Sequence, residues 1–336
     1  IELYGRVPRT KTNQQMLREL DRLYELGYRG HVDFVDDNLI GNKKAVKAFL
    51  PDLARWNETH DYPFEFSTEA SINLSDDPDL LNLMRGANFF AVFVGIESPD
   101  PATLNLMRKK QNTRRNIAES IHKIYSYGIF VNAGFILGFD SEKGSVADAM
   151  VELIEDAAIP LSIVGLLYAL PGTQLTRRLE KEGRLHSNHD LFSPGDQCTH
   201  GLNFDPARPL RDILVDYKNI LEHIFDPVAY AGRLDRLVSM LDRSGSQREL
   251  PEGDLRSKFG TMEKVHRIMG QLPMRERFWK TLTNCVKNNP RVMTSLMMLM
   301  AVYLHLGPYS RFIISAMDRR IAEIDARESA PLVAAE

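Results

Sequence analysis

Five apolar segments alternate with amphipathic segments in the first half of the chain. The apolar segments are rich in Val, Ile and Phe, which is typical of strands, and their near-continuous apolar character favours burial on both faces of a sheet. We predict strands at residues 31–35, 64–69, 89–96 and 163–170, and one more within residues 128–140. Strands that alternate with helices at this spacing predict an α/β fold with a parallel sheet covered by helices.

The amphipathic segments carry the start and stop signals of helices. Thr12 followed by Gln15 is a capping box, and Asp77 before Pro78 is a second helix start. We predict helices at residues 12–26, from 42 onward with a kink at Pro51, at 77–86, up to 109, at 114–127, at 145–158 and up to 182.

The second half of the chain shows helical periodicity without strand signals. We predict helices at residues 210–225, 227–241, 255–269, 274–287, 292–306 and 309–327. Gly307 and Pro308 are expected to separate the last two of these helices. The predicted organisation is an α/β domain at residues 1–183, a connecting loop at residues 184–209, and an all-helical domain at residues 210–330.

Polar residues or glycines follow every predicted strand. The strand ends carry, in order, Asp36-Asp37-Asn38, Glu69, Glu97-Ser98, Gly138 with Asp140, and Pro171-Gly172. Because the carboxyl ends of parallel strands meet at one edge, these residues predict the rim of a ligand site. Gly134 and Gly138 leave the backbone accessible to a flat ligand. One alternative stays open, because Asp36, Asp37 and Glu97 are also typical caps of a following helix.

Composition narrows the class of protein. Hydrophobic residues make up 43% and charged residues 26%, an ordinary globular mixture. Lys and Arg number 42 against 45 acidic residues, which gives no reason to expect a nucleic-acid partner. The 2 cysteines, Cys198 and Cys285, lie far apart, which favours a reducing, cytoplasmic compartment and supplies no zinc or iron–sulfur spacing.

Four segments in this order resemble the cobalamin-dependent radical S-adenosylmethionine (SAM) enzymes. HVDFVDDN at residues 31–38 is similar to the second-strand segment that holds the methionine amino group of SAM, and FVGIES at residues 93–98 to the fourth-strand ribose segment. GFILGFD at residues 134–140 resembles the fifth-strand glycine motif beside the adenine, and LLYALPGTQL at residues 166–175 the sixth-strand segment that closes over the base. The order and spacing are more specific than any single motif.

The resemblance implies a partial parallel (β/α) barrel of the radical SAM type whose first strand is missing. It also implies SAM, a four-iron, four-sulfur cluster and cobalamin as cofactors, which together form a 5′-deoxyadenosyl radical and methylate an unactivated carbon. Within it, a carboxylate after the first predicted strand suits the ammonium group of SAM, and Glu97 suits the ribose hydroxyls. The residues expected to bind SAM are Asp36, Asp37, Asn38, Glu69, Glu97, Ser98, Gly134, Ile136, Gly138, Leu170 and Pro171.

The sequence departs from the family pattern in two respects. It lacks the Cys-x-x-x-Cys-x-x-Cys motif that binds the cluster, and it lacks the N-terminal cobalamin-binding domain. We therefore expect a fragment of a longer enzyme that is inactive alone and holds no metal through its own residues. Ser141 stands where the glycine motif carries glutamate, so Asp140 or Glu142 is the candidate replacement.

The C-terminal helices resemble the extension behind the radical domain in the group that includes hopanoid C-2 methylases. The expected activity is therefore the C-methylation of a hopanoid-type lipid. An electron donor such as a flavodoxin or ferredoxin is expected to supply the electrons. Two alternatives stay open: an oxidative cyclase or ring-modifying enzyme of tetrapyrrole metabolism, and a non-catalytic nucleotide-binding remnant. The Met-rich segment 292–306 is expected to be a core helix or an apolar wall for lipid, with peripheral contact at the inner face of the membrane.

Two further clusters are predicted to be ordinary surface features rather than binding sites. The basic run at residues 108–115 is predicted to be a solvated helix junction, with contact to a cofactor phosphate or carboxylate as the alternative. His186, His189 and His200 lie in a predicted loop and match no metal-ligand spacing.

Overall fold

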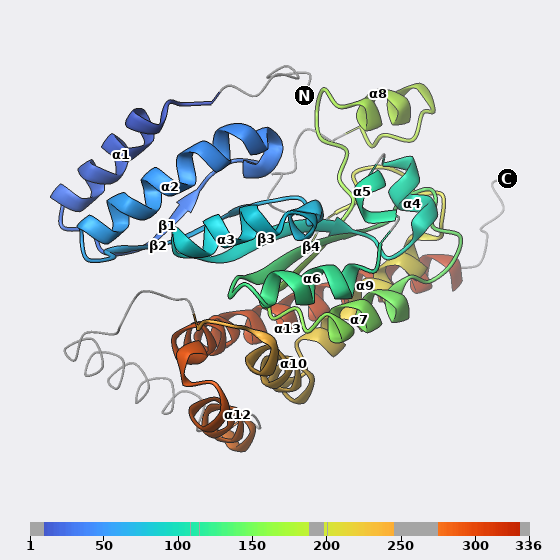
Figure 1. Cartoon of the computed structure of the whole chain (residues 1–336). Helices are drawn as coiled ribbons and strands as arrows, with labels where there is room; N and C mark the ends of the chain where they lie inside the picture. Colours follow the sequence, from blue (N-terminus) through green and yellow to red (C-terminus); the bar gives the residue numbers. More distant parts are fainter. Residues whose placement is uncertain are drawn as a thin grey trace, which may run out of the picture.

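The computed structural model describes residues 10–107, 109–113, 115–187, 198–199, 201–244 and 275–329. Its centre is a parallel sheet of five strands in the order β1-β2-β3-β4-β5 (Figure 1). Each strand lies beside the one that precedes it in the chain, which is the order of a (β/α) barrel rather than of a doubly wound sheet. The strands are β1 (Gly30–Phe34), β2 (Phe64–Glu69), β3 (Phe89–Glu97), β4 (Phe130–Leu137) and β5 (Ser162–Leu166). The predicted α/β half-barrel is confirmed.

The helices between the strands begin where the sequence places their caps. Thr12, Asn42 and Asp77 each accept a backbone N–H of the following turn, and Pro51 lies inside its helix. These helices are α1 (Asn13–Glu25), α2 (Lys43–Thr59), α3 (Pro78–Gly86), α4 (Pro101–Leu106), α5 (Lys110–Thr113), α6 (Ile117–Tyr125), α7 (Ala147–Asp156) and α8 (Gln174–Lys181). Two short 3-10 helices, η1 (Leu39–Asn42) and η2 (Ile72–Asp76), follow β1 and β2.

The C-terminal part is helical and packs directly on the sheet. Its described elements are α9 (Leu210–Ile224), α10 (Pro227–Met240), α12 (Arg275–Asn288), η4 (Pro290–Val292) and α13 (Met293–Ser329). The hydroxyl of Tyr217 on α9 donates to the carbonyl of Val164 on β5 at 3.2 Å, and one apolar cluster runs through both parts. The helix predicted at residues 255–269 lies outside the described residues, and the domain boundaries stay predictions.

The predicted break at Gly307 and Pro308 is wrong, because α13 runs through both residues as one helix of 37 residues. Tyr303 before the proline and Ile313 after it are both buried in the same core, so tertiary packing outweighs the cost of about 3 kcal/mol for an internal proline. Among the described residues, 290–329 form one helix long and apolar enough to cross a membrane, but 39% of its apolar window is buried, and core helices meet the same criterion.

The last predicted strand is also too long, because β5 ends at Leu166 rather than at residue 170. The chain then pairs with a segment that sequence periodicity does not connect to it. Leu202 N donates to Leu167 O at 2.9 Å, and the Asn203 side chain bonds both the N–H and the carbonyl of Ala169. Leu167 still donates to the Leu137 carbonyl of β4 at 2.7 Å, but beyond it the segment is held by a distant loop.

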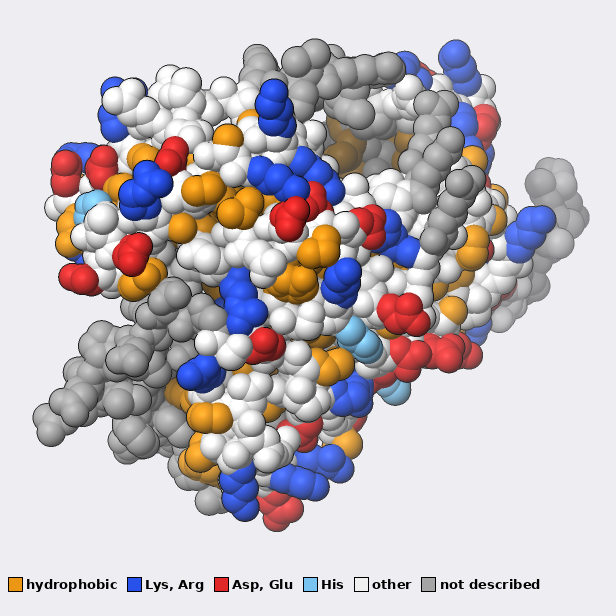
Figure 2. Space-filling model, viewed as in Figure 1, with side chains coloured by type: hydrophobic (Ala, Val, Ile, Leu, Met, Phe, Trp, Pro, Cys, Tyr) orange, Lys and Arg blue, Asp and Glu red, His pale blue; other side chains and the backbone are white. Residues whose placement is uncertain are grey.

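The two faces of the sheet differ in burial, which the prediction of continuous burial missed. Alternate residues of β4 are buried, whereas Asn132, Gly134 and Ile136 are only partly buried. Helices α2, α3 and α6 cover one side of the sheet (Figure 1). On the face of the molecule seen in Figure 2, acidic and basic side chains are interspersed rather than gathered into one basic patch. These partly buried residues of β4 define the partly open face of the sheet.

Candidate functional site

Glycines from two neighbouring strands lie side by side on the partly open face. Gly95 of β3 is paired in register with Gly134 of β4. A Cβ atom on Gly134 would come within 2.9 Å of the Phe93 ring, and one on Gly95 within 2.5 Å of Glu97 Oε1. The two glycines therefore form a floor of backbone on which the Phe93 ring and the Glu97 carboxylate lie directly. Sequence analysis found Gly134 but missed Gly95, although the alternation in FVGIES puts Gly95 and Glu97 on one face.

Glu97 is held over this floor in an unusual backbone conformation. Its φ is +71°, a region that residues other than glycine rarely adopt and that costs about 1–3 kcal/mol. The pairing of β3 with β4 shifts between Gly95 and Glu97, and Lys109 Nζ lies 2.8 Å from Glu97 Oε1. Asp100, not Glu97, caps α4, so the helix-cap alternative for Glu97 is wrong. Lys109 lies at the predicted junction, between α4 and α5, and its partly exposed side chain pairs with Glu97, the carboxylate expected to bind the ribose.

Asp36 and Asp37 are exposed after β1, while Asn38 is partly buried and forms a hydrogen bond to the next loop. Asn38 Oδ1 accepts the Ser71 N–H at 3.1 Å and so joins the loops after β1 and β2. Asn42 caps α2, so neither aspartate caps that helix, but both lie in the loop after β1, where Asp36 Oδ1 accepts the Asn38 N–H at 2.9 Å ahead of η1. A cavity of about 520 Å³ at the edge of β1, between α1 and α2, is lined in part by Asp36.

Glu69 stands near this acidic group and its pKa is raised, first by burial and then by Asp37, Asp33 and Asp36. We expect Asp37→Asn to lower the pKa of Glu69 toward its ordinary value, as followed by NMR titration of its side-chain carbonyl. Because the folded state raises this pKa, the associated stability is present at low pH and is lost as the pH rises through the folded pKa. Asp79→Asn, at an exposed carboxylate in the first turn of α3, is the control. An equal shift in both variants contradicts the prediction.

In the turn after β4, Glu142 rather than Asp140 takes the part that an acidic residue at position 141 was expected to play. Both oxygens of Glu142 lie 3.2 Å from the Gly138 nitrogen and accept its N–H, and Gly138 has a φ of +97°. Asp140 instead forms ion pairs with Arg178 at 2.8 Å and Arg184 at 2.6 Å, and the hydrogen bond from Arg184 holds the pKa of Asp140 below its usual range. Glu142 therefore supports the glycine turn.

The other predicted binding residues occupy different surroundings. Ser98 is 1% exposed, and its hydroxyl accepts the Asp100 N–H at 3.2 Å. Leu170 and Pro171 are exposed and lie in the turn before α8. Ile136 shares the open face with Gly134. The structure thus brings together the residues of β3 and β4, while Ser98 faces the interior and Leu170 and Pro171 lie in a separate turn beyond β5.

One polar atom that sequence analysis missed lies on the same face. Asn132 Oδ1 is buried and has no hydrogen-bond partner, and Asn132 pairs in register with Phe93. An unpaired buried acceptor costs about 1–3 kcal/mol, so a ligand N–H or O–H placed there would be stabilised. The Glu97 carboxylate and this acceptor have the hydrogen-bonding chemistry that the hydroxyl and amino groups of an adenosine moiety require. The signal in the sequence is a lone amide within an apolar strand.

The described residues do not fit an iron–sulfur cluster. Among them, no group of three or more His, Cys, Asp or Glu side chains could hold a metal ion. Cys285 is buried and Cys198 is partly buried, and they lie in different elements. His186 pairs with Asp205 at 3.1 Å, and His189 and His200 lie outside the described residues.

Two family models match the chain. Residues 3–154 match the Radical SAM superfamily, and residues 173–319 match a domain of unknown function, DUF4070. Strands β1 to β4, with Gly95, Glu97 and Gly134, all lie within the segment that matches the Radical SAM superfamily. The chain combines this superfamily's segment with a DUF4070 segment behind it.

Three curated relatives are similar to the chain. The uncharacterized methyltransferase sll1242 of Synechocystis sp. is 39% identical over 98% of this chain and 61% of its own length. The hopanoid C-2 methylase of Rhodopseudomonas palustris is 35% identical over 92% and 58%, and the bacteriochlorophyllide d C-12(1)-methyltransferase of Chlorobaculum tepidum is 24% identical over 52% and 36%. The chain thus spans about three fifths of the length of the first two relatives.

Proposed function

We propose that this chain is the SAM-binding part of a cobalamin-dependent radical methyltransferase that acts on an unactivated carbon of a hopanoid-type lipid. The observation that carries the proposal is the floor of Gly95 and Gly134 beneath Glu97, within the segment that matches the Radical SAM superfamily. Similarity to a hopanoid C-2 methylase over 92% of the chain supports the substrate class.

Each residue of the site has a defined task in this proposal. The two carboxylate oxygens of Glu97 accept the ribose hydroxyls, and the ion pair with Lys109 holds that carboxylate in place. Gly95 and Gly134 let the adenosine lie against backbone, and Asn132 Oδ1 accepts a donor from the ligand. Asp37 is exposed at the end of β1, where a carboxylate suits an ammonium group. When bound, SAM supplies the 5′-carbon and the methyl group of the reaction.

The lipid substrate and a peripheral membrane location extend the same proposal. Phe312 on α13 is 57% exposed and Tyr309 is 39% exposed, and their rings are stacked with centroids 6.3 Å apart. Exposed aromatic side chains on a long apolar helix favour contact with a lipid or with the inner face of the membrane. A flavodoxin or ferredoxin is the proposed electron donor.

The test uses the protein expressed from its complete open reading frame and assayed without oxygen. SAM labelled with ¹³C in its methyl group is supplied with a reductant, cobalamin and a hopanoid lipid, and the products are analysed by mass spectrometry. We expect the labelled methyl group in the lipid and a loss of labelling of at least tenfold in Glu97→Gln. A modified product without label would contradict methylation and favour an oxidative reaction. Absence of SAM binding would contradict the whole proposal.

A further inference from the structure

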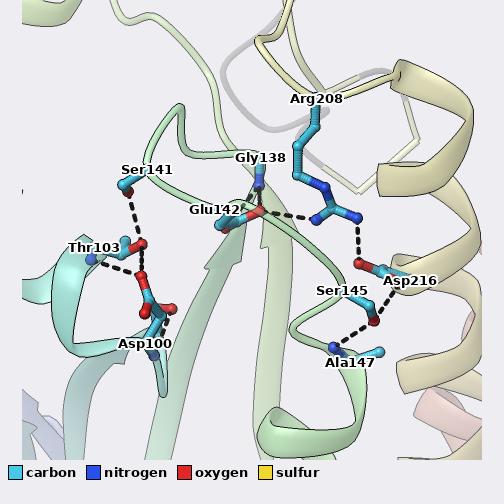
Figure 3. Close-up of polar contacts among 10 residues, drawn as sticks. Asp100, Thr103, Gly138, Ser141, Glu142, Ser145, Ala147, Arg208 and Asp216 are labelled. Carbon is cyan, nitrogen blue, oxygen red and sulfur yellow. Dashed lines mark hydrogen bonds and ion pairs between the residues drawn. The ribbon is translucent and has the colours of Figure 1, made fainter.

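The turn that ends β4 is held by side chains from the second half of the chain. Arg208 lies just before α9 and reaches Glu142 Oε2 with Nη1 at 3.3 Å and Asp216 Oδ2 with Nη2 at 2.8 Å. Figure 3 shows this guanidinium between the two carboxylates, with Glu142 directly below the Gly138 nitrogen. The Gly138 turn is thus connected to α9 through two ionic contacts and one backbone hydrogen bond.

All three charged side chains are withdrawn from water. The exposed fractions are 0% for Glu142, 9% for Arg208 and 7% for Asp216. Burial raises the pKa of the Glu142 carboxyl, while the Gly138 and Phe139 amides and Arg208 oppose that shift. Removal of the guanidinium would leave two buried carboxylates facing each other, an arrangement that is costly in a region of low dielectric constant.

Further contacts fix the same turn from both sides. Ser145 Oγ donates to Asp216 Oδ1 at 2.7 Å, so Asp216 binds the loop after β4 directly as well as through Arg208. On the opposite side, Thr103 lies 2.7 Å from the Ser141 hydroxyl, and Thr103 already donates to the α4 cap (Figure 3). Ser141 is therefore the donor to Thr103. The turn is clamped between α4 and α9 by polar contacts that residues 138–145 cannot supply alone.

We propose that Arg208 is a positioning residue that fixes the Gly138 turn through Glu142 and so makes the DUF4070 segment set the affinity of the radical SAM segment for adenosine. This inference rests on the proposed nucleotide site. Arg208 does not touch the nucleotide; it holds the carboxylate that holds the strand end beside the adenosine floor. Gly138 comes directly after β4, the strand that carries Gly134 and Ile136, so a displaced turn moves the edge of that floor.

The test measures binding of 5′-deoxyadenosine and of SAM to the full chain by isothermal titration calorimetry, well below the unfolding midpoint of each variant. We expect Arg208→Gln to raise the Kd for 5′-deoxyadenosine roughly tenfold and Arg208→Lys to raise it less. The matched control is Arg211→Gln, three residues later in the first turn of α9, where the ion pair with Asp325 is about half exposed. That control should leave the Kd unchanged.

Three outcomes separate the possibilities. If Arg208→Gln lowers the unfolding midpoint but leaves the Kd unchanged, Arg208 is only structural and the inference is overturned. If the unmodified chain binds neither nucleoside, the proposed function fails as well. Should Arg208→Gln not fold, Asp216→Asn is measured instead, because it keeps the hydrogen-bonding shape and removes one charge; an unchanged Kd there also overturns the inference.

Discussion

Replacing Arg233 with methionine is expected to lower the free energy of unfolding by about 3–5 kcal/mol. Arg233 on α10 is 2% exposed, and its guanidinium binds Glu155 at 2.5 Å and the Ile159 carbonyl at 3.1 Å. It also donates to the Ile224 carbonyl at the end of α9. Methionine has a similar length but no donors, so two buried carbonyls lose their partner. Urea unfolding followed by circular dichroism measures the effect.

Arg236 provides a matched control because it binds the same carboxylate from the surface. Its guanidinium lies 2.5 Å from Glu155 Oε2, but its side chain is 45% exposed. An exposed ion pair contributes about 0.2–1 kcal/mol, so Arg236→Met should shift the urea midpoint only slightly. Similar losses in the two variants would show that burial does not decide the value of this contact, contrary to the prediction.

The order of the strands was predictable because its signals are local. An apolar run that ends in a carboxylate or a glycine defines both a strand and its end, and parallel topology then brings those ends to one edge. Glu97 and Gly134 were identified in this way, and the structure places both on the partly open face. Their positions depend on the period of a strand, which a short window of sequence contains.

Contacts between distant segments could not be predicted in the same way. Arg208 meets a carboxylate 66 residues earlier in the chain, and nothing near Glu142 in the sequence indicates such a partner. The early end of β5 depends on Leu202 and Asn203, and the continuity of α13 through Pro308 depends on packing against α9 and α10. In each case tertiary contacts override a correct local preference.

Gly138→Ala is expected to lower the free energy of unfolding by about 3 kcal/mol. With a φ of +97°, Gly138 adopts a conformation in which an L side chain is strained. The added Cβ would also lie 2.7 Å from Leu202 Cδ2, and Leu202 is 3% exposed and has little room to move. Backbone strain is the larger part, because the contacting atom is the end of a flexible side chain.

Gly144→Ala in the same loop separates these causes from a general intolerance of the turn. No atom lies within 4 Å of a Cβ built on Gly144, and its φ is not in the left-handed region. Alanine there restricts the unfolded chain, so stability should stay equal or rise by about 0.4–1 kcal/mol. Unfolding midpoints of the two variants, compared in urea, decide the matter. If Gly138→Ala is as stable as Gly144→Ala, the turn after β4 does not need a glycine, and its described geometry is not what holds the strand end.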